Sequence, residues 1–356
     1  MYWLFTAARR LRQLGVLGMN RRNAACILDH NPRASFPVVD DKMRLHRLCG
    51  EIGVPTPEVY AEVTSYSMLR RLGDLLAQRG DFVLKPNRGS AGRGVLVVAG
   101  RDAAGFRRHN GELIRLEELR QHVSDILSGM YSLGGQPDSA IVQQRVRLHP
   151  AFAAITYKGI PDVRVILYRD QPAMAMLRLP TKQSNGRANL HQGGIGAGVE
   201  LETGLTHARC SATAPSSGTR TPAGPSSACA CRSGTRCWTM SRRVSEAVGL
   251  GYLGVDIVVD AVCVPMLLEA NARPGLAIQI ANGRGLVPGK LEAIDERLDR
   301  RPATISTSRC AEAGDGASAA EPPDELGDQG TAPLTPGEKR VTSGGTATRS
   351  RSSPPS

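Results

Sequence analysis

Residues 81–94 read DFVLKPNRGSAGRG, an apolar run followed by a glycine-rich one. Its first five residues, which end at Lys85, form a short apolar run that predicts a buried strand. The glycine-rich run that follows is a poor helix former, because ordering glycine costs the most backbone entropy. Residues 95–98, Val-Leu-Val-Val, then return as an antiparallel partner. We therefore expect a β-hairpin with a long glycine-rich tip.

The tip has the composition of a phosphate-binding loop. Gly89, Gly92 and Gly94 let the backbone approach a ligand closely and offer amide N–H groups to phosphate oxygens. Lys85 ends the strand where its ammonium group can reach a phosphate as a point charge. The stretch is not a P-loop, because the lysine precedes the glycines and no helix follows. A flexible hairpin tip without a ligand is the alternative that this stretch alone leaves open.

The rest of the chain alternates short helices with further hairpins. Helical patterns cover residues 41–52, 67–79, 112–130 and 240–248, and strand patterns cover residues 141–146, 163–168, 173–179, 253–259 and 265–269. Hairpins outnumber strand–helix–strand crossovers. We therefore expect an α+β fold with mostly antiparallel sheets.

Three oxygen-bearing side chains lie on the last two of these strands. Asp256 interrupts an apolar strand, where an unpaired carboxylate would cost several kcal/mol. Glu269 and Asn271 are two residues apart on a strand, so their side chains share one face. Carboxylate and amide oxygens suit Mg²⁺, which shares its remaining positions with water and phosphates. We predict a metal site here; the alternative is a buried carboxylate paired with Arg164 or Arg273.

Residues 187–198 read RANLHQGGIGAG, where polar side chains precede four glycines in six residues. This composition indicates backbone that approaches a ligand closely. Upstream, Asp162 and Arg164 alternate with valines and so face one side of their strand. We predict that Arg164 and Arg187 neutralise phosphate charge in a transition state. His191 on its own is more typical of a hydrogen-bonding structural histidine than of a catalytic base.

Composition and charge narrow the class of protein. The formal net charge is +12, but the excess is spread over the chain and forms no basic helix or aromatic-interleaved patch. We therefore expect no nucleic-acid partner, since a site for phosphates and acidic substrates explains the charge as well. The eight cysteines include no CxxC pair, which favours a reduced, cytoplasmic compartment over a disulfide or zinc framework.

The N-terminal 18 residues combine apolar side chains with Arg9, Arg10 and Arg12. A signal peptide would place charge before a longer apolar run, and a transmembrane segment needs about 20 apolar residues. We expect no transmembrane segment and an amphipathic helix that packs on the body or on a partner. Contact with a membrane surface is the alternative.

Taken in chain order, these features resemble the ATP-grasp superfamily. The matching residues are Asp41-Lys42, Gly53 to Pro57, Val83 to Pro86 with the glycine loop, Val142 to Gln144, Asp162 to Arg164, Arg187 to Asn189, Asp256 and Glu269 to Asn271. The strings from Arg187 to Gly194 and from Asn271 to Leu276 resemble alpha-L-glutamate ligase-like proteins, related to the ribosomal-protein glutamate ligases and of the sugar-transfer associated ATP-grasp type. The resemblance implies two α+β lobes that grip ATP between their sheets.

The resemblance also implies a role for each motif. The nucleotide-binding residues would be Lys42, Lys85, Gly89, Ser90, Gly92, Gly94, Gln144 and Val146, the last two at the adenine and ribose. The position of Gln144 is usually acidic in the superfamily, which leaves the ribose contact open. The ligands of one or two Mg²⁺ or Mn²⁺ ions would be Asp256, Glu269 and Asn271. The catalytic residues at the γ-phosphate and acyl-phosphate would be Arg164, Arg187 and Asn189.

The implied reaction is that of an ADP-forming acid–amino-acid ligase. ATP would phosphorylate a carboxylate substrate, and an amino acid or peptide amine would then displace phosphate to form an amide. The alternative is a module that binds ATP and Mg²⁺ without ligase activity, either inactive or dependent on a partner.

We expect four segments along the chain. They are a short helical segment at 1–40, a nucleotide-binding lobe at 41–145, a second lobe at 146–298 and a disordered tail at 299–356. Superfamily members commonly carry a domain of about 100 residues ahead of the first lobe, whereas about 40 residues precede it here. A partner protein could therefore supply part of the substrate surface.

An anomalous insert interrupts the second lobe at residues 210–239. It contains four cysteines and Trp238, yet it lacks Leu, Ile, Val, Met, Phe, Tyr, Asp, Glu and Lys. Family-like sequence resumes abruptly at Ser241. We hypothesise a double frameshift, which a second-frame translation of these codons would test; failure to recover family-like sequence would contradict it. A lineage-specific disordered insertion is the alternative.

Overall fold

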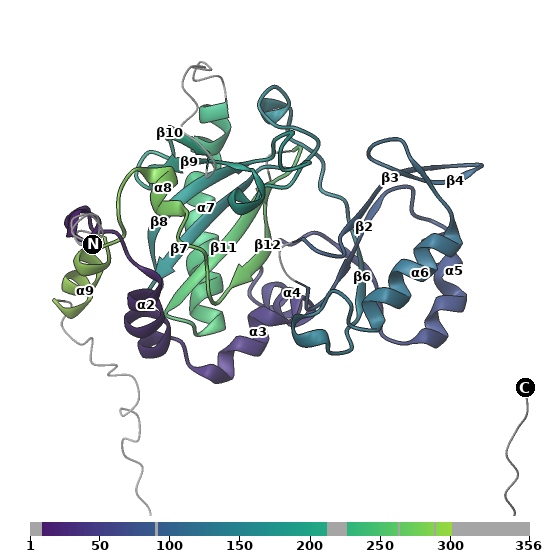
Figure 1. Cartoon of the computed structure of the whole chain (residues 1–356), viewed down its shortest axis with the longest axis horizontal. Helices are drawn as coiled ribbons and strands as arrows, with labels where there is room; N and C mark the ends of the chain where they lie inside the picture. The colour runs from purple at the N-terminus through teal and green to yellow at the C-terminus, as the bar shows by residue number, and fades with distance from the viewer. Residues whose placement is uncertain (1–8, 90–91, 212–225, 263, 288–289, 301–356) are drawn as a thin grey trace, which may run out of the picture. The chain divides into compact units, whose positions relative to one another are not determined.

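The computed structural model describes residues 9–89, 92–211, 226–262, 264–287 and 290–300. All of them belong to one compact unit, Met1–Ala303, which contains two six-stranded antiparallel sheets with helices packed on them (Figure 1). This confirms the predicted α+β fold. Of the tail expected at 299–356, residues 301–356 lie outside the described part. Among the described residues, no helix has the length and apolar content needed to cross a bilayer.

The first sheet has the strand order β1-β6-β2-β3-β4-β5. Its strands are β1 (Val59–Val63), β2 (Phe82–Pro86), β3 (Leu96–Asp102), β4 (Gly105–Arg108), β5 (Leu113–Ile114) and β6 (Ala140–Gln143). β2 and β3 are antiparallel, with Val83 opposite Val97, which confirms the predicted hairpin. One face packs on helices α5 (Leu72–Leu76) and α6 (Leu116–Leu127). The alternation along β2 therefore leaves Lys85 on the opposite face.

Two helices predicted for this lobe were wrong in extent. Residues 66–71 form the 3₁₀ helix η3 (Tyr66–Arg71), and only α5 that follows is α-helical. The pattern at 112–130 includes β5, because Ile114 pairs with Phe106 and is buried at the sheet edge. Helix α6 begins only after Arg115, whose backbone N–H donates to the carboxylate of Glu118.

The second sheet has the strand order β10-β9-β8-β7-β11-β12. Its strands are β7 (Asp162–Tyr168), β8 (Gln171–Leu179), β9 (Ile195–Val199), β10 (Thr206–Ser211), β11 (Tyr252–Val259) and β12 (Pro265–Asn271). The predicted hairpin of β7 and β8 is confirmed, and its turn residues Arg169 and Asp170 both have positive φ. Such a turn matches the right-handed twist of the flanking strands.

Helices cover the second sheet unequally on its two faces. Helix α7 (Ser226–Val248) packs on one face through Met240 and Val244, against residues such as Val165 and Val255. On the other face, helices α8 (Ile278–Asn282) and α9 (Leu291–Asp299) cover the apolar end near the β7–β8 turn. The remaining half of that face carries charged side chains from β7, β8, β11 and β12.

The glycines of strand β9 have an explanation in packing. They were interpreted as backbone near a ligand, but residues 195–199 form a regular strand paired with β8 and β10. A Cβ at Gly196 would lie 2.9 Å from a methyl carbon of Leu190 and 3.0 Å from the Cβ of Ala281 in α8. Gly196 is therefore needed for close packing against these residues, so the pattern does not require a ligand.

The expected insert at 210–239 is partly structured. Strand β10 extends to Ser211, residues 212–225 lie outside the described part, and residues from Ser226 onward belong to helix α7. Cys237 is buried in the core, and the Trp238 indole N–H donates to the Leu201 carbonyl at 2.9 Å. The C-terminal part of the insert is thus helical rather than disordered. Alanine, serine and arginine permit a helix once Cys237 and Met240 anchor it on the sheet.

The segment before the first sheet packs on the second sheet. It contains α2 (Met19–Arg21), the π-helix η1 (Arg22–Leu28), the 3₁₀ helix η2 (Arg33–Ser35), α3 (Phe36–Asp40) and α4 (Lys42–Glu51). Leu17 and Ile27 are buried in the same cluster as Tyr168 and Leu286. The remaining short elements are the 3₁₀ helices η4 (Leu133–Gly135), η5 (Pro150–Phe152) and η6 (Leu190–Gln192).

Asn31 forms hydrogen bonds that join the N-terminal segment to the second sheet, and its substitution tests this part of the fold. Its side-chain amide donates to the carbonyls of Tyr252 and Ala272 and accepts from the Tyr252 N–H. Asn31→Ala should lower the free energy of unfolding by about 2–3 kcal/mol, because it leaves buried backbone groups unsatisfied. Denaturant unfolding measures the change. The exposed Asn23→Ala serves as control, and equal effects of the two substitutions would contradict the assignment.

Candidate functional site

A buried network of two carboxylates and two guanidinium groups lies on the polar half of the second sheet. Arg164 in β7 binds Asp256 in β11 in bidentate fashion, with Nε–Oδ1 at 2.6 Å and Nη2–Oδ2 at 2.5 Å. Arg178 in β8 reaches Asp256 Oδ2 at 2.8 Å through Nη2 and Asp162 Oδ1 at 2.5 Å through Nε. Three neighbouring strands are therefore linked by one chain of charge-assisted hydrogen bonds.

The strand register places these four side chains together. Asp256 lies opposite Arg164, and Asp162 lies opposite Arg178. Residues directly opposite in an antiparallel pair point to the same face, while intervening residues such as Val163 and Val255 enter the apolar core on the other face. Asp162, Arg178 and Asp256 are each less than 9% exposed, so each charge needs a partner.

The two carboxylates differ in proton affinity. Burial raises the pKa of Asp256, but Arg164 and Arg178 more than offset this and lower it to about 2. Burial raises the pKa of Asp162 to about 6, because only Arg178 contacts it closely and the charge of Asp256 adds to the increase. Asp256 is thus a carboxylate at neutral pH, and its two guanidinium partners stabilise that state.

Glu269 and Asn271 lie beside Asp256, as the sequence predicted. Glu269 is directly opposite Asp256 in β12, and the Asn271 amide nitrogen lies 3.5 Å from Asp256 Oδ2. A β-bulge in β12 displaces Leu268, which is 37% exposed. Glu269 is half-buried and forms no hydrogen bond or ion pair with another described residue. The three predicted metal ligands therefore lie together, and Glu269 has oxygens available.

This donor set fits a hard cation that binds oxygen. Two carboxylates and an amide oxygen are ligand types that Mg²⁺ and Mn²⁺ accept, usually with phosphate oxygens and water completing the shell. Both oxygens of Asp256 accept from guanidinium groups, so Glu269 is the more available ligand. In the described part of the chain, no three His, Cys, Asp or Glu side chains gather as a self-sufficient metal site.

Lys85 connects the first sheet to these carboxylates. Burial lowers the pKa of Lys85 to about 7, the charge of Lys42 adds to the decrease, and Glu269 opposes it. Lys42 and Lys85 line a common pocket with His46 and Gln143 from the first lobe and Leu267 and Leu268 from β12. We call this the lysine pocket. An anionic ligand there would restore the charged form of Lys85.

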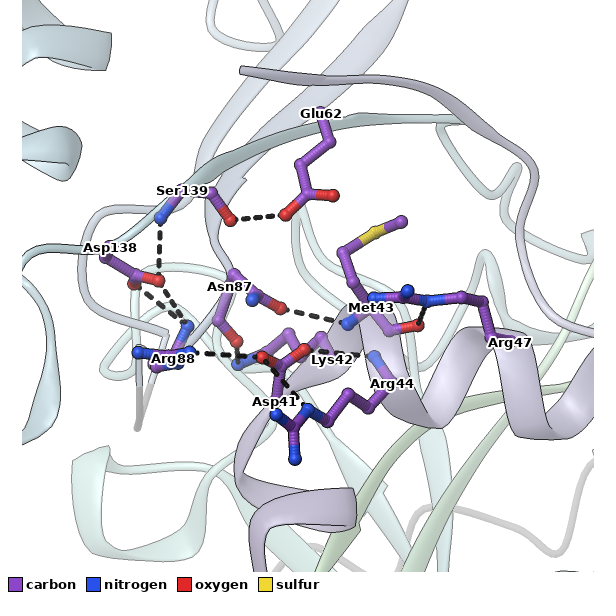
Figure 2. A network of polar contacts seen from close by, with 10 residues as sticks. All are labelled: Asp41, Lys42, Met43, Arg44, Arg47, Glu62, Asn87, Arg88, Asp138 and Ser139. Carbon is purple, nitrogen blue, oxygen red and sulfur yellow. Dashed lines mark hydrogen bonds and ion pairs between the residues drawn. The ribbon is translucent and has the colours of Figure 1, made fainter. Parts of the chain in front are cut away.

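The N-terminus of helix α4 is tied to the start of the glycine-rich loop (Figure 2). Asp41 caps the helix by accepting from the Arg44 N–H at 3.0 Å, and Asn87 Oδ1 accepts from the Met43 N–H at 2.9 Å. The Lys42 ammonium donates to the carbonyls of Asn87 and Gly89, at 3.1 and 2.7 Å. Lys42 thus positions the loop, and its predicted contact with ATP stays a prediction.

The end of the loop is held by α6 and the segment that follows it. Gly92 and Gly94 have positive φ, and a Cβ at Gly94 would lie 2.5 Å from the Tyr131 ring. The Gly94 carbonyl is also 2.9 Å from His122 Nε2. Gly89 forms an isolated bridge with Ser132, and the predicted contact residue Ser90 lies outside the described residues. The backbone at Gly89 and Gly94 is therefore fixed by neighbours.

The residues predicted to bind adenine and ribose line a second pocket. Gln144 and Val146 border it with Tyr60, Arg145 and Met266, in a cavity of about 300 Å³. The Gln144 side chain accepts from the Glu58 N–H at 3.0 Å, and Val146 packs on Val258 and Met266. The residues predicted to bind the nucleotide are thus divided between this pocket and the lysine pocket.

The predicted catalytic residues are only partly brought together. Arg164 is in the network, whereas Arg187 is exposed and Asn189 caps η6 by accepting from the His191 N–H at 3.1 Å. Neither forms a hydrogen bond or ion pair with the network in the described part of the chain. His191 is exposed, with Nε2 at 3.8 Å from a Cβ built at Gly275.

Arg178 and His46 were not among the site residues predicted from the sequence. Arg178 follows Met176 by two residues in the apolar strand β8. A charged residue in such a strand indicates a buried ion pair, and this pattern could have identified Arg178. His46 follows Lys42 by four residues on α4, so both share one helix face. Its Nδ1 is 2.9 Å from the Thr56 hydroxyl, and burial together with Lys85 lowers its pKa.

The lowered pKa of Lys85 makes stability depend on pH. Between pH 7 and 10.5 the unfolded chain holds a proton that folded Lys85 has lost, so the free energy of unfolding rises with pH in that window. Relative to Lys85→Met, the native protein should gain stability from pH 7 to 10, by at most about 1.4 kcal/mol per pH unit. Denaturant unfolding at three pH values measures this, and a constant difference between the two proteins would contradict it.

The network predicts a large cost for losing Arg178. Arg178→Met should lower the free energy of unfolding by about 3–5 kcal/mol, because it leaves buried Asp162 without its partner and weakens the support of Asp256. Arg107→Met breaks an exposed ion pair with Asp102 and should cost less than about 1 kcal/mol. Chemical denaturation compares them, and similar losses would show that the network contributes no more than a surface pair.

Comparisons with known proteins agree with this architecture. The profile of the sugar-transfer associated ATP-grasp family matches residues 21–296. Among curated proteins, none matches this chain. Similar solved structures include the ATP-grasp ligase PsnB complexed with a minimal precursor, at 17% identity and TM-score 0.39. That alignment covers 76% of this chain and 63% of PsnB, so the chain spans less than two thirds of PsnB.

Two further structures show the same range of similarity. An L-amino acid ligase from Bacillus licheniformis is 12% identical, with 70% of this chain and 44% of the ligase covered at TM-score 0.40. An ATP-grasp RimK domain protein from Sphaerobacter thermophilus is 16% identical, with 74% and 70% covered at TM-score 0.41. The family profile covers well over half of the chain and confirms the resemblance found in the sequence. The chain belongs to the sugar-transfer associated ATP-grasp family.

Proposed function

We propose that this protein is an ATP-dependent, ADP-forming carboxylate–amine ligase. The observation that carries the proposal is the proximity of Lys85, in the first sheet, to Glu269, which lies opposite Asp256 in the second. The buried Lys85 and the two carboxylates on β11 and β12 provide the positive and negative charges that a nucleotide–metal complex requires. Family membership supports ATP as the nucleotide.

The proposed reaction has two steps. An oxygen of the substrate carboxylate attacks the γ-phosphorus of ATP, the bond from that phosphorus to the bridging oxygen of ADP breaks, and an acyl-phosphate forms. An amine nitrogen then attacks the acyl carbon, phosphate leaves, and the amine proton passes to water. The product is an amide, glutamate-like or peptide-like by the resemblance described above. Positioning and electrostatic stabilisation supply most of such catalysis.

Residues of this chain have separate proposed roles. Lys42 and Lys85 hold the phosphates, with Gly89, Gly92 and Gly94 nearby in the loop. Asp256, Glu269 and Asn271 would hold Mg²⁺ or Mn²⁺, which neutralises phosphate charge when bound. Arg164 would stabilise the transferring phosphate, while Arg178 keeps Asp256 ionised. Arg187 and Asn189 approach the acyl-phosphate from their loop.

A second candidate follows from the state of Asp256. Both of its oxygens accept from guanidinium groups, which favours a module that binds ATP without turnover until a partner or substrate displaces Arg164. The two candidates differ in ADP release. They do not differ in nucleotide binding.

ADP release with ATP, Mg²⁺ and a panel of amino acids and short peptides tests the ligase. Turnover should occur with at least one pair of substrates and fall at least about 100-fold in Glu269→Ala, which removes a metal ligand. Glu292→Ala, which removes an exposed carboxylate in α9, serves as control and should keep native activity. ATP binding without ADP release across the panel would contradict the ligase and favour the second candidate.

A further inference from the structure

Two loops beside the polar half of the second sheet carry cations that no carboxylate neutralises. They are residues 156–161, before β7, and residues 180–187, after β8. Lys158, Lys182 and Arg187 are exposed and form no ion pair with another described residue. Three positive charges on two short loops raise the local positive potential and favour the binding of an anion.

The strand register brings the two loops together. Asp162 at the start of β7 lies opposite Arg178 near the end of β8. Lys158 precedes Asp162 by four residues, and Lys182 follows Arg178 by four. Both lysines therefore flank the end of the hairpin at which the buried network begins.

One hydrogen bond and one close backbone contact join the two loops, and further hydrogen bonds order the second loop. The Tyr157 N–H donates to the Pro180 carbonyl at 3.1 Å, and the Gly186 N–H donates to the Thr181 carbonyl at 3.2 Å. The Thr181 hydroxyl donates to the Gly193 carbonyl at 2.7 Å. A Cβ at Gly159 would meet the Gly186 carbonyl oxygen at 1.9 Å, so only glycine permits this approach. The lysines and the arginine are thus carried by loops whose backbone is held in place by these contacts.

Both lysines have their ammonium groups near the ring of Tyr157. Lys158 Nζ is 5.2 Å and Lys182 Nζ is 6.0 Å from the ring centroid. Cation–π attraction of this length is weak, and two ammonium groups near one ring repel each other. Lys158 also has a φ of 56°, in the left-handed region that disfavours side chains. Backbone strain of this kind is often found at ligand-binding positions.

We propose that Tyr157, Lys158 and Lys182 form a subsite for anionic groups of the substrate, beyond the carboxylate that reacts. The inference rests on the proposed ligase function and assigns its substrate class: a molecule with additional carboxylates or phosphate esters. The ring supports an apolar stem, and the two ammonium groups bind the anions. The subsite is separate from Lys42 and Lys85, which hold the nucleotide phosphates.

Direct binding of labelled peptides tests the subsite without turnover. The full chain is titrated against fluorescein-labelled triglutamate, a peptide of two phosphoserines, and triglutamine, with fluorescence anisotropy as the readout. Lys158→Gln combined with Lys182→Gln should weaken binding of at least one anionic peptide about tenfold. Arg70→Gln combined with Arg71→Gln removes the same charge from exposed positions near α5 and should leave affinity within about twofold of native.

The outcomes are distinct. Loss with triglutamate alone identifies carboxylates, and loss with the phosphoserine peptide alone identifies phosphate esters. Equal loss in both double variants, or binding of triglutamine as tight as that of the anionic peptides, overturns the proposal, because either shows that only net charge or peptide backbone acts. Because the readout is binding, absence of ADP release would count against the ligase alone.

Discussion

Asp256 accepts hydrogen bonds from Arg164 and Arg178 in the middle of the second sheet, and the polar half of that sheet depends on these contacts. Without them a carboxylate that is 3% exposed would have to be protonated or hydrated. With them, charged side chains occupy a sheet face whose other half is apolar and covered by helices. Because the network spans β7, β8 and β11, it also fixes where Glu269 and Asn271 lie.

The same contacts limit what Asp256 can do alone. A metal ion would share Asp256 with arginines, whereas Glu269 has oxygens available. Glu269 is also the carboxylate that acts on the pKa of Lys85. The charge of Glu269 therefore acts on Lys85 across the two sheets without an ion pair between them, and a nucleotide with its metal would satisfy both charges together. This explains how a lysine with a pKa of about 7 is retained in a buried position.

Much of this arrangement could be predicted from sequence because it follows from local patterns. The run ending at Lys85 and the return at residues 95–98 specify a hairpin, and the two-residue spacing of Glu269 and Asn271 specifies a shared face. Arg178 could not be assigned a partner, because its contacts with Asp162 and Asp256 depend on the register of three strands. The sequence could not show why Gly196 in β9 lacks a side chain, because close packing against Ala281 and close approach of a ligand both require glycine. Helix α7 was predicted too short, since its first half lacks the large apolar residues that mark a helical period.

The central claim is that Lys85 and Glu269 receive a nucleotide and its metal together. The most direct measurement is electron paramagnetic resonance of free Mn²⁺ during titration with the protein, with and without ATP. Mn²⁺ should be bound tightly only when ATP is present, and both Glu269→Gln and Lys85→Met should weaken the complex about tenfold or more. Mn²⁺ binding that is independent of ATP, or unchanged in both variants, would contradict it.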